Sequence, residues 1–325
     1  MDSNRSLDIV IPVYNEAPVL GRVFEHLNRS FSLPARTSRG ISTVRFIFID
    51  DGSSDDTTSL ITDEIRRGSP AALLCLSRNF GHQSALAAGL DFSTADLVAV
   101  IDADLQDPPE LILEMIERLK EGFDIVFGQR HHRKEAFYKR LCYWAFYRLC
   151  SLLSEVSMPV DAGDFCVMKS DVVRALRSLP EKLRFQRGLR SWIGFRQSAF
   201  LYDRPGRELG VTKYTWRKLY ALATDGIASL SIRPLRITQV MLFISAILTT
   251  GYISMLILLF LRSDHPGSQV LWFLTTQGLI AITSSLQLFC LYIMGAYLGR
   301  MYLEVKGRPP YIVMRTVTPE SVKSS

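Results

Sequence analysis

The sequence predicts an α/β domain built on a mostly parallel sheet, followed by a pair of transmembrane helices. Short apolar segments alternate with segments of helical periodicity in the first part of the chain, and two long uncharged stretches lie near the C-terminus. Alternation of this kind is typical of a parallel sheet covered by helices. An uncharged stretch of more than about 20 residues is long enough to cross a bilayer as a helix.

The elements of the first domain follow one another in regular order. The predicted strands are Asp8–Val13, Val44–Ile49, Ala72–Leu76, Asp96–Ile101 and Asp124–Phe127. The predicted helices are Val19–Phe31, Thr57–Arg67, His82–Asp91 and Pro109–Glu121. Because ligands of such sheets bind beyond the carboxyl ends of the strands, the residues that follow each strand are the candidates for function.

The two uncharged stretches are Ile237–Leu261 and Val270–Gly299. Two buried core helices are the alternative, but soluble core helices rarely run so long without a charge. Basic residues lie outside the two stretches and the loop between them is short, so the positive-inside rule predicts that both termini face the cytoplasm. We divide the chain into a catalytic domain (1–212), an amphipathic juxtamembrane region (213–236), the helix pair (237–299) and a cytoplasmic tail (300–325).

Amphipathic character also marks 135–153 and 214–232, where basic residues alternate with aromatic ones. We expect both segments to lie on the membrane surface, with packing against the first domain as the alternative. Glycines in the helix pair permit close helix packing, so both a monomer and a homo-oligomer agree with the sequence.

Composition narrows the class of protein. The 325 residues carry a net charge of +6, which favours an anionic partner, and 48% are hydrophobic, which excludes a disordered chain. The five cysteines show no paired spacing, so we expect neither a zinc site nor a disulfide framework. Neither GxGxxG nor GxxxxGK[ST] occurs, which argues against a dinucleotide-dependent dehydrogenase and a P-loop NTPase.

Acidic residues follow three of the predicted strands. Glu16 comes shortly after the first, Asp50 and Asp51 after the second, and Asp102 and Asp104 after the fourth. The spacing of Asp102 and Asp104 directs both carboxylates into one cleft, where they could bind a hard divalent cation. A solvated acidic turn that caps the next helix is the alternative.

Several motifs together resemble a known family. IPVYNE, DDGSSD, SRNFGHQSALAAG, DADLQDPP and GQR occur in the order seen in inverting glycosyltransferases with the GT-A fold. DAGDFCVM, RFQRGLRSWIGF, RELGVTKY and the helix pair look like its polyprenyl-phosphate branch, which includes dolichol-phosphate mannose synthases and bactoprenol glucosyltransferases. The resemblance covers nearly the whole chain.

The resemblance implies a role for each matching residue. Nucleotide-sugar binding would involve Pro12, Tyr14, Glu16, Asp50, Asp51, Asp102, Gln106, Arg207 and Lys213. Asp102, Asp104 and Gln106 would hold Mg²⁺ or Mn²⁺ with the diphosphate, and Arg130 and Arg140 would receive the lipid phosphate. Asp104, Asp164 and Arg130 would act in catalysis, although a phosphate acceptor is already largely ionised at neutral pH and needs no base at Asp164.

The resemblance therefore implies a membrane-anchored, metal-dependent enzyme that transfers one sugar from UDP-glucose to undecaprenyl phosphate, with no nucleic-acid partner. GDP-mannose with dolichyl phosphate, or a modified pentose donor, remains an alternative. A processive polysaccharide synthase is disfavoured, because Gln186 to Trp192 does not have the spacing of the QxxRW motif. A membrane scaffold would explain the charge and the apolar helices but not the DADLQD segment.

Overall fold

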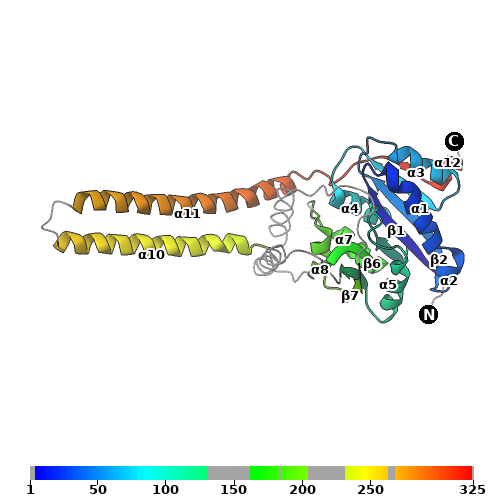
Figure 1. Ribbon diagram of the computed structural model, residues 1–325, viewed down its shortest axis with the longest axis horizontal. Helices are drawn as coiled ribbons and strands as arrows, with labels where there is room; N and C mark the ends of the chain where they lie inside the picture. Colours follow the sequence, from blue (N-terminus) through cyan, green and yellow to red (C-terminus); the bar gives the residue numbers. More distant parts are fainter. Residues whose placement is uncertain (1–3, 131–161, 183, 204–230, 263–267, 324–325) are drawn as a thin grey trace.

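A computed structural model describes residues 4–130, 162–182, 184–203, 231–262 and 268–323. A sheet domain lies at one end, and two long helices project from it side by side (Figure 1). Two predicted surface segments, 135–153 and most of 214–232, fall outside the described residues.

Within the described residues, one eight-stranded sheet has the order β7-β5-β6-β4-β1-β2-β3-β8. The strands are β1 Arg5–Val13, β2 Ile41–Asp50, β3 Ala71–Leu76, β4 Leu97–Val100, β5 Ile125–Arg130, β6 Ala162–Lys169, β7 Gln197–Tyr202 and β8 Val313–Val317. The pairs β1–β2, β1–β4, β2–β3 and β5–β7 are parallel. The strands β6 and β8 run antiparallel to their neighbours, so the sheet is mostly parallel as predicted.

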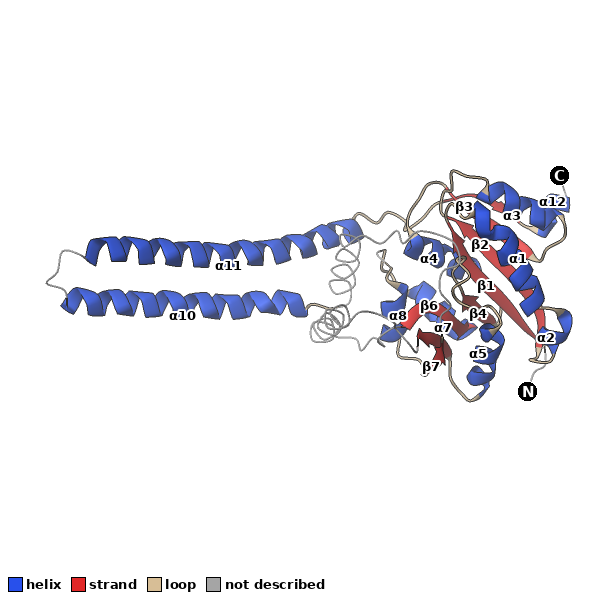
Figure 2. Ribbon diagram, viewed as in Figure 1, coloured by secondary structure: helices blue, strands red, loops and turns tan. Residues whose placement is uncertain are grey.

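Helices cover both faces of the sheet (Figure 2). They are α1 Ala17–Ser30, α2 Leu33–Thr37, α3 Thr57–Arg66, α4 His82–Phe92, α5 Leu111–Lys120, α7 Ser170–Ser178, α8 Gln186–Trp192 and α12 Pro319–Lys323. One buried cluster joins the sheet to α1, α3 and α5, and a second joins it to α4, α7 and α8. The domain is therefore a three-layer α/β/α sandwich.

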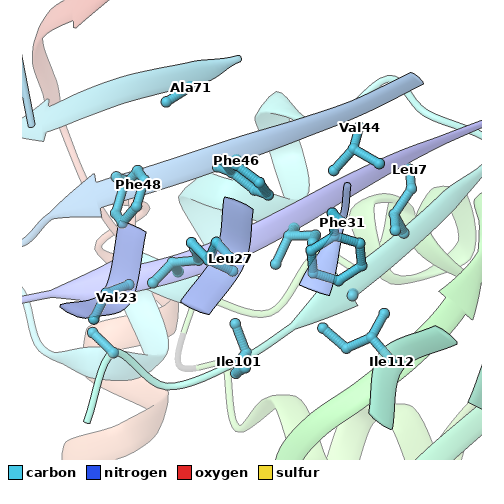
Figure 3. Packing of buried hydrophobic residues seen from close by; sticks show 14 of the residues in the cluster. Leu7, Val23, Leu27, Phe31, Val44, Phe46, Phe48, Ala71, Ile101 and Ile112 are labelled. Atoms are coloured by element: carbon cyan, nitrogen blue, oxygen red, sulfur yellow. The ribbon is translucent and has the colours of Figure 1, made fainter. Parts of the chain in front are cut away.

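The core beneath α1 is built from large apolar side chains. Phe46 and Phe48 of β2 lie against Val23 and Leu27 of α1 (Figure 3). The Phe24 and Phe48 ring centroids are 4.9 Å apart. Burial of these side chains is the main source of stability for the central strands, at about 25 cal/mol per Å² of apolar surface.

The two projecting helices are α10 Arg233–Arg262 and α11 Ser268–Val305. Their segments Arg233–Leu258 and Thr275–Val305 are long and apolar enough to cross a membrane, and neither is buried inside the protein. The alternative of two buried core helices therefore does not hold. The Tyr252 hydroxyl lies within hydrogen-bond distance of Thr275 and Thr276, which joins the two helices.

The chain after α11, predicted as a tail (300–325), returns to the sheet. The strand β8 pairs with β3, and the Ser77 N–H donates to the Ile312 carbonyl over 2.9 Å. The Tyr311 hydroxyl donates to Asp91 over 2.8 Å. At the base of α11, Glu304 accepts from the Lys182 N–H. These contacts attach the sheet domain to the helix pair at two places.

Candidate active site

The acidic residues predicted from the sequence meet at the carboxyl edge of β1, β2 and β4. Val13 at the end of β1 is in register with Asp50 at the end of β2, and β4 pairs with β1 on the other side. Pro12 is buried at the end of β1, whereas Tyr14 is exposed in the loop that follows. Parallel pairing thus gathers residues that are far apart in the chain.

The loops after β1 and β2 are joined by hydrogen bonds. The Asn15 N–H donates to the Ser53 hydroxyl over 2.9 Å, and the Ser54 N–H donates to the Asn15 amide oxygen over 2.8 Å. The Glu16 N–H donates to the Thr57 hydroxyl over 3.0 Å. Asn15 has a positive φ of 53°, which asparagine tolerates better than most residues. The two loops therefore form one shaped wall at the sheet edge.

The carboxylates of Asp50 and Asp51 accept hydrogen bonds from other groups of the protein. Asp50 accepts from the Ser53 N–H over 2.9 Å and from the Thr58 hydroxyl over 2.5 Å. Both side chains are buried, with exposed fractions of 3% and 4%. The structure therefore shows a loop-shaping role for these two residues, whose part in nucleoside binding stays a prediction.

Asp51 holds the loop that leads into α4. Its two carboxylate oxygens accept from the Phe80 N–H over 2.7 Å and from the Gly81 N–H over 2.9 Å. Burial raises the pKa of Asp51, although these two N–H groups lower it in part. Beside it, Gly52 has a φ of +74°, and a Cβ there would lie 2.6 Å from the Arg78 backbone. The close packing of these loops places His82 at the edge of the site.

The acidic turn after β4 concentrates negative charge. The Gln106 N–H donates to Asp104 Oδ1 over 3.1 Å, and Leu105 between them has a positive φ of 56°. Burial raises the pKa of Asp102 to about 6; His82 opposes this rise, while the charges of Asp164, Asp107 and Asp104 add to it. A cation bound at this turn would relieve that repulsion.

The metal site predicted from Asp102, Asp104 and Gln106 would supply two carboxylates and one amide oxygen, and it stays a prediction. Among the residues that the structure describes, no three His, Cys, Asp or Glu side chains are grouped as a ready-made metal site. Mg²⁺ is usually held by one or two carboxylates together with phosphate oxygens of the substrate and water. The donor set of this turn fits that kind of site.

Asp164 of β6 is the most strongly engaged carboxylate in the cluster. Arg187 of α8 contacts it with two hydrogen bonds, from Nε to Oδ1 over 2.8 Å and from Nη2 to Oδ2 over 2.9 Å. His82 Nε2 lies 3.3 Å from Asp164 Oδ2 and 3.7 Å from Asp102 Oδ1. The sheet thus brings Asp164 beside the turn after β4, although the two segments are far apart in sequence.

The charge state of Asp164 follows from these neighbours. Burial favours its protonated form, but the Arg187 charge and the hydrogen bonds from His82 and Arg187 outweigh burial and hold the pKa of Asp164 far below its ordinary value. The pKa of His82 is raised, because its contacts with Asp164 and Asp102 outweigh burial. A carboxylate held this way is a poor proton acceptor at neutral pH.

Several predicted residues are not brought into this site by the described structure. Arg140, Arg207 and Lys213 lie outside the described residues. The backbone of Arg130 ends β5, paired with Tyr202 of β7, and its side chain is not described. Their predicted contacts with phosphate stay predictions.

Two residues of the cluster received no role from the sequence. His82 and Arg187 lie in motifs that carry the family resemblance, SRNFGHQSALAAG and RFQRGLRSWIGF, but nothing in their local pattern distinguishes them from surface charge. Only the packing of α4 and α8 against β6 shows that both reach Asp164.

Known proteins match the chain over the sheet domain and beyond it. A sequence profile described as Glycosyl transferase family 2 matches residues 8–177. An uncharacterized glycosyltransferase of Synechocystis sp. is 40% identical over 310 residues, which cover 94% of this chain and 94% of that protein. The SfII prophage-derived bactoprenol glucosyl transferase of Shigella flexneri is 33% identical over 314 residues, which cover 95% and 98%.

Among solved structures, the S. aureus protein TarS (residues 1–349) in complex with UDP has a TM-score of 0.44 at 12% identity, covering 69% of this chain and 64% of that chain. The match to the two sequence relatives, in contrast, includes both the sheet domain and the C-terminal helices of this chain.

Proposed function

The chain belongs to glycosyl transferase family 2, and from that premise we propose that it transfers a single sugar from a nucleotide sugar to a polyprenyl phosphate, with inversion. The bactoprenol glucosyl transferase of Shigella flexneri supports this acceptor, because the similarity includes the helix pair. We favour UDP-glucose as donor and undecaprenyl phosphate as acceptor. GDP-mannose with dolichyl phosphate is the alternative pair.

One observation carries the proposal more than any other: the acidic turn of Asp102 and Asp104 adjoins the loops after β1 and β2 at one edge of the sheet. Ligands bind at this edge in open α/β sheets. The wall formed by the two loops would hold the nucleoside, with Tyr14 exposed beside it. The acidic turn would then face the diphosphate.

Metal dependence is part of the proposal. Asp102 and Asp104, with Gln106, would hold Mg²⁺ or Mn²⁺ against the diphosphate of the donor. A divalent cation there would neutralise the charge that grows on the departing nucleotide. Without a cation, two anionic substrates would meet beside a cluster of carboxylates, which electrostatics disfavours.

Asp164 has a role other than general base in this reaction. A phosphate monoester is largely ionised at neutral pH and can attack the sugar without losing a proton. The bidentate contact with Arg187 keeps Asp164 ionised and in place. Arg130 and Arg140 would bring the lipid phosphate into line with the donor sugar, which reduces the entropic cost of the encounter.

Membrane anchoring through α10 and α11 would keep the enzyme beside its lipid acceptor. The basic residues that flank the helix pair favour a cytoplasmic position for the sheet domain and both termini. The bacterial inner membrane or a plasma membrane is the compartment that we propose.

The test is transfer of label into lipid. Detergent-purified protein is incubated with Mn²⁺ or Mg²⁺, undecaprenyl phosphate, and radiolabelled UDP-glucose or GDP-mannose in separate reactions, and label is extracted into organic solvent. We expect extractable label from UDP-glucose and none after chelation of the metal. Label from GDP-mannose alone would overturn the choice of UDP-glucose. No label from either donor, with dolichyl phosphate also tested, would overturn both proposed donors.

A further inference from the structure

A continuous line of side chains crosses the site from α8 to the end of β4. It begins at Arg187, whose two hydrogen bonds to Asp164 fix both oxygens of that carboxylate. It continues through His82, the first residue of α4, to Asp102. Three elements, α8, β6 and α4, and the turn after β4 each contribute one member.

The first contact of this line is rigid for a geometric reason. A bidentate arginine contact fixes the plane of a carboxylate as well as its position. The Asp164 side chain has an exposed fraction of only 4%, so it cannot turn toward solvent to make other contacts. Arg187 therefore fixes where Asp164 presents its Oδ2 atom to His82, and Gln83 Nε2 also donates to that oxygen over 3.5 Å.

A second arginine on α8 fixes the backbone next to Asp164. Arg190 donates to the Gly163 carbonyl over 3.2 Å, and its guanidinium lies 5.3 Å from the centroid of the Phe127 ring. The start of α8 is joined to α4, because the Gln186 N–H donates to the Gln83 side-chain oxygen over 2.8 Å. The two helices and β6 thus hold Asp164 and His82 in one relative arrangement.

At its far end the line reaches Asp102, whose carboxylate must be oriented to bind a metal ion. Asp102 and Asp104 both lie in the turn after β4, so the direction of the Asp102 carboxylate decides whether the two can face one cation. His82 Nε2 lies 3.3 Å from Asp164 Oδ2 and 3.7 Å from Asp102 Oδ1, so it connects the two carboxylates. Loss of His82, or of the carboxylate that orients it, would remove this contact from Asp102.

We propose that Arg187, Asp164 and His82 form a positioning relay that orients Asp102 for binding of the metal and the nucleotide. The inference rests on the proposed function, which assigns Asp102 to the donor site. It gives Arg187 and His82 a role through Asp102 and requires no contact between Arg187 and either substrate. A relay also predicts that its members act as one unit, which two independent binding residues would not do.

Binding of UDP in the presence of Mn²⁺ tests the relay without turnover. Isothermal titration of the full chain in detergent compares the wild type with Arg187→Gln, His82→Ala and the double variant. We expect each single variant to lose about tenfold in affinity and the double variant to lose no more than about twofold beyond the weaker single variant, since coupled residues are non-additive. Losses that multiply to about a hundredfold would overturn the relay, because independent sites are additive.

Matched variants separate positioning from charge and from folding. Arg187→Lys keeps the charge but not the bidentate geometry, so it should bind UDP more weakly than the wild type and more tightly than Arg187→Gln. Arg174→Gln removes an arginine of α7 that pairs with Asp171 on the surface and should leave affinity unchanged. Should Arg187→Gln fail to fold by circular dichroism, the cycle is run with Arg187→Lys, and additivity again overturns the relay.

The outcomes distinguish the relay from the proposed function. Wild-type protein that binds neither UDP nor GDP with Mn²⁺ would overturn the donor assignment itself, and the relay with it. Wild-type affinity in both single variants, with normal binding by the wild type, would overturn the relay alone.

Discussion

The Asp51 carboxylate joins the turn after β2 to the loop before α4, and its removal separates a structural role from a ligand role. In Asp51→Ala, the Phe80 and Gly81 N–H groups lose the acceptors that lie 2.7 and 2.9 Å away. The residue has an exposed fraction of 4%, so water does not readily replace the lost oxygens. We therefore expect the variant to be less stable than the wild type.

The size of the effect follows from the two contacts. A hydrogen bond to a charged group contributes about 1.5–3 kcal/mol. Because burial raises the pKa of Asp51, desolvation offsets part of that gain, and we use the lower value. Two such bonds give a loss of about 3 kcal/mol in the free energy of unfolding. For a domain of about 150–250 residues, this corresponds to a fall of about 6–12 °C in Tm.

Thermal unfolding followed by tryptophan fluorescence measures this fall, with Asp56→Ala as the control. Asp56 is exposed and its side chain makes no capping hydrogen bond to α3, so the control should unfold within about 2 °C of the wild type. UDP affinity is measured on both variants below their unfolding temperatures. An Asp51→Ala variant with wild-type Tm and no UDP binding would refute the loop-shaping role and support a direct nucleoside contact.

Three further predictions concern catalysis, pH and packing. Asp104→Ala should reduce label transfer by more than about a hundredfold while leaving Tm within about 2 °C; substantial activity would contradict the metal assignment. Asp164→Asn should lower Tm most at neutral pH, because Arg187 depresses the pKa of Asp164 in the folded protein. The stability that the ionised Asp164 contributes is therefore complete above about pH 4–5 and declines as the pH falls further. A Tm difference between wild type and Asp164→Asn that stays constant from pH 7 to pH 3 would contradict that sign. Gly89→Ala should cost about 1–2 kcal/mol in chemical denaturation, because a Cβ there would lie 2.4 and 2.6 Å from side chains of β1 and β2; a more stable variant would show that these side chains can move aside.

Local patterns in the sequence were sufficient to predict much of the secondary structure. The five predicted strands and four predicted helices of the first domain all form, with ends that shift by a few residues. Apolar periodicity and turn residues act over short distances, so a single segment contains the information that defines its secondary structure. The apolar helix pair was predicted for the same reason, because length and lack of charge are properties of the segment alone.

Pairing between distant segments was not predictable in this way. The strand β6 inserts antiparallel between β4 and β5, and β8 returns after the helix pair to extend the edge beside β3. Their positions depend on pairing with strands that lie far away in the sequence.

In the candidate site, too, some features follow from local sequence and others from contacts between distant segments. The sequence by itself determined that Asp50, Asp51, Asp102 and Asp104 lie at or just after strand ends of a parallel sheet, because strand ends are encoded locally. Only the tertiary structure decided that Asp51 holds the loop before α4 and that Asp164 meets both His82 and Arg187. A carboxylate finds its hydrogen-bond partners through the packing of whole elements, and that packing is a property of the complete chain.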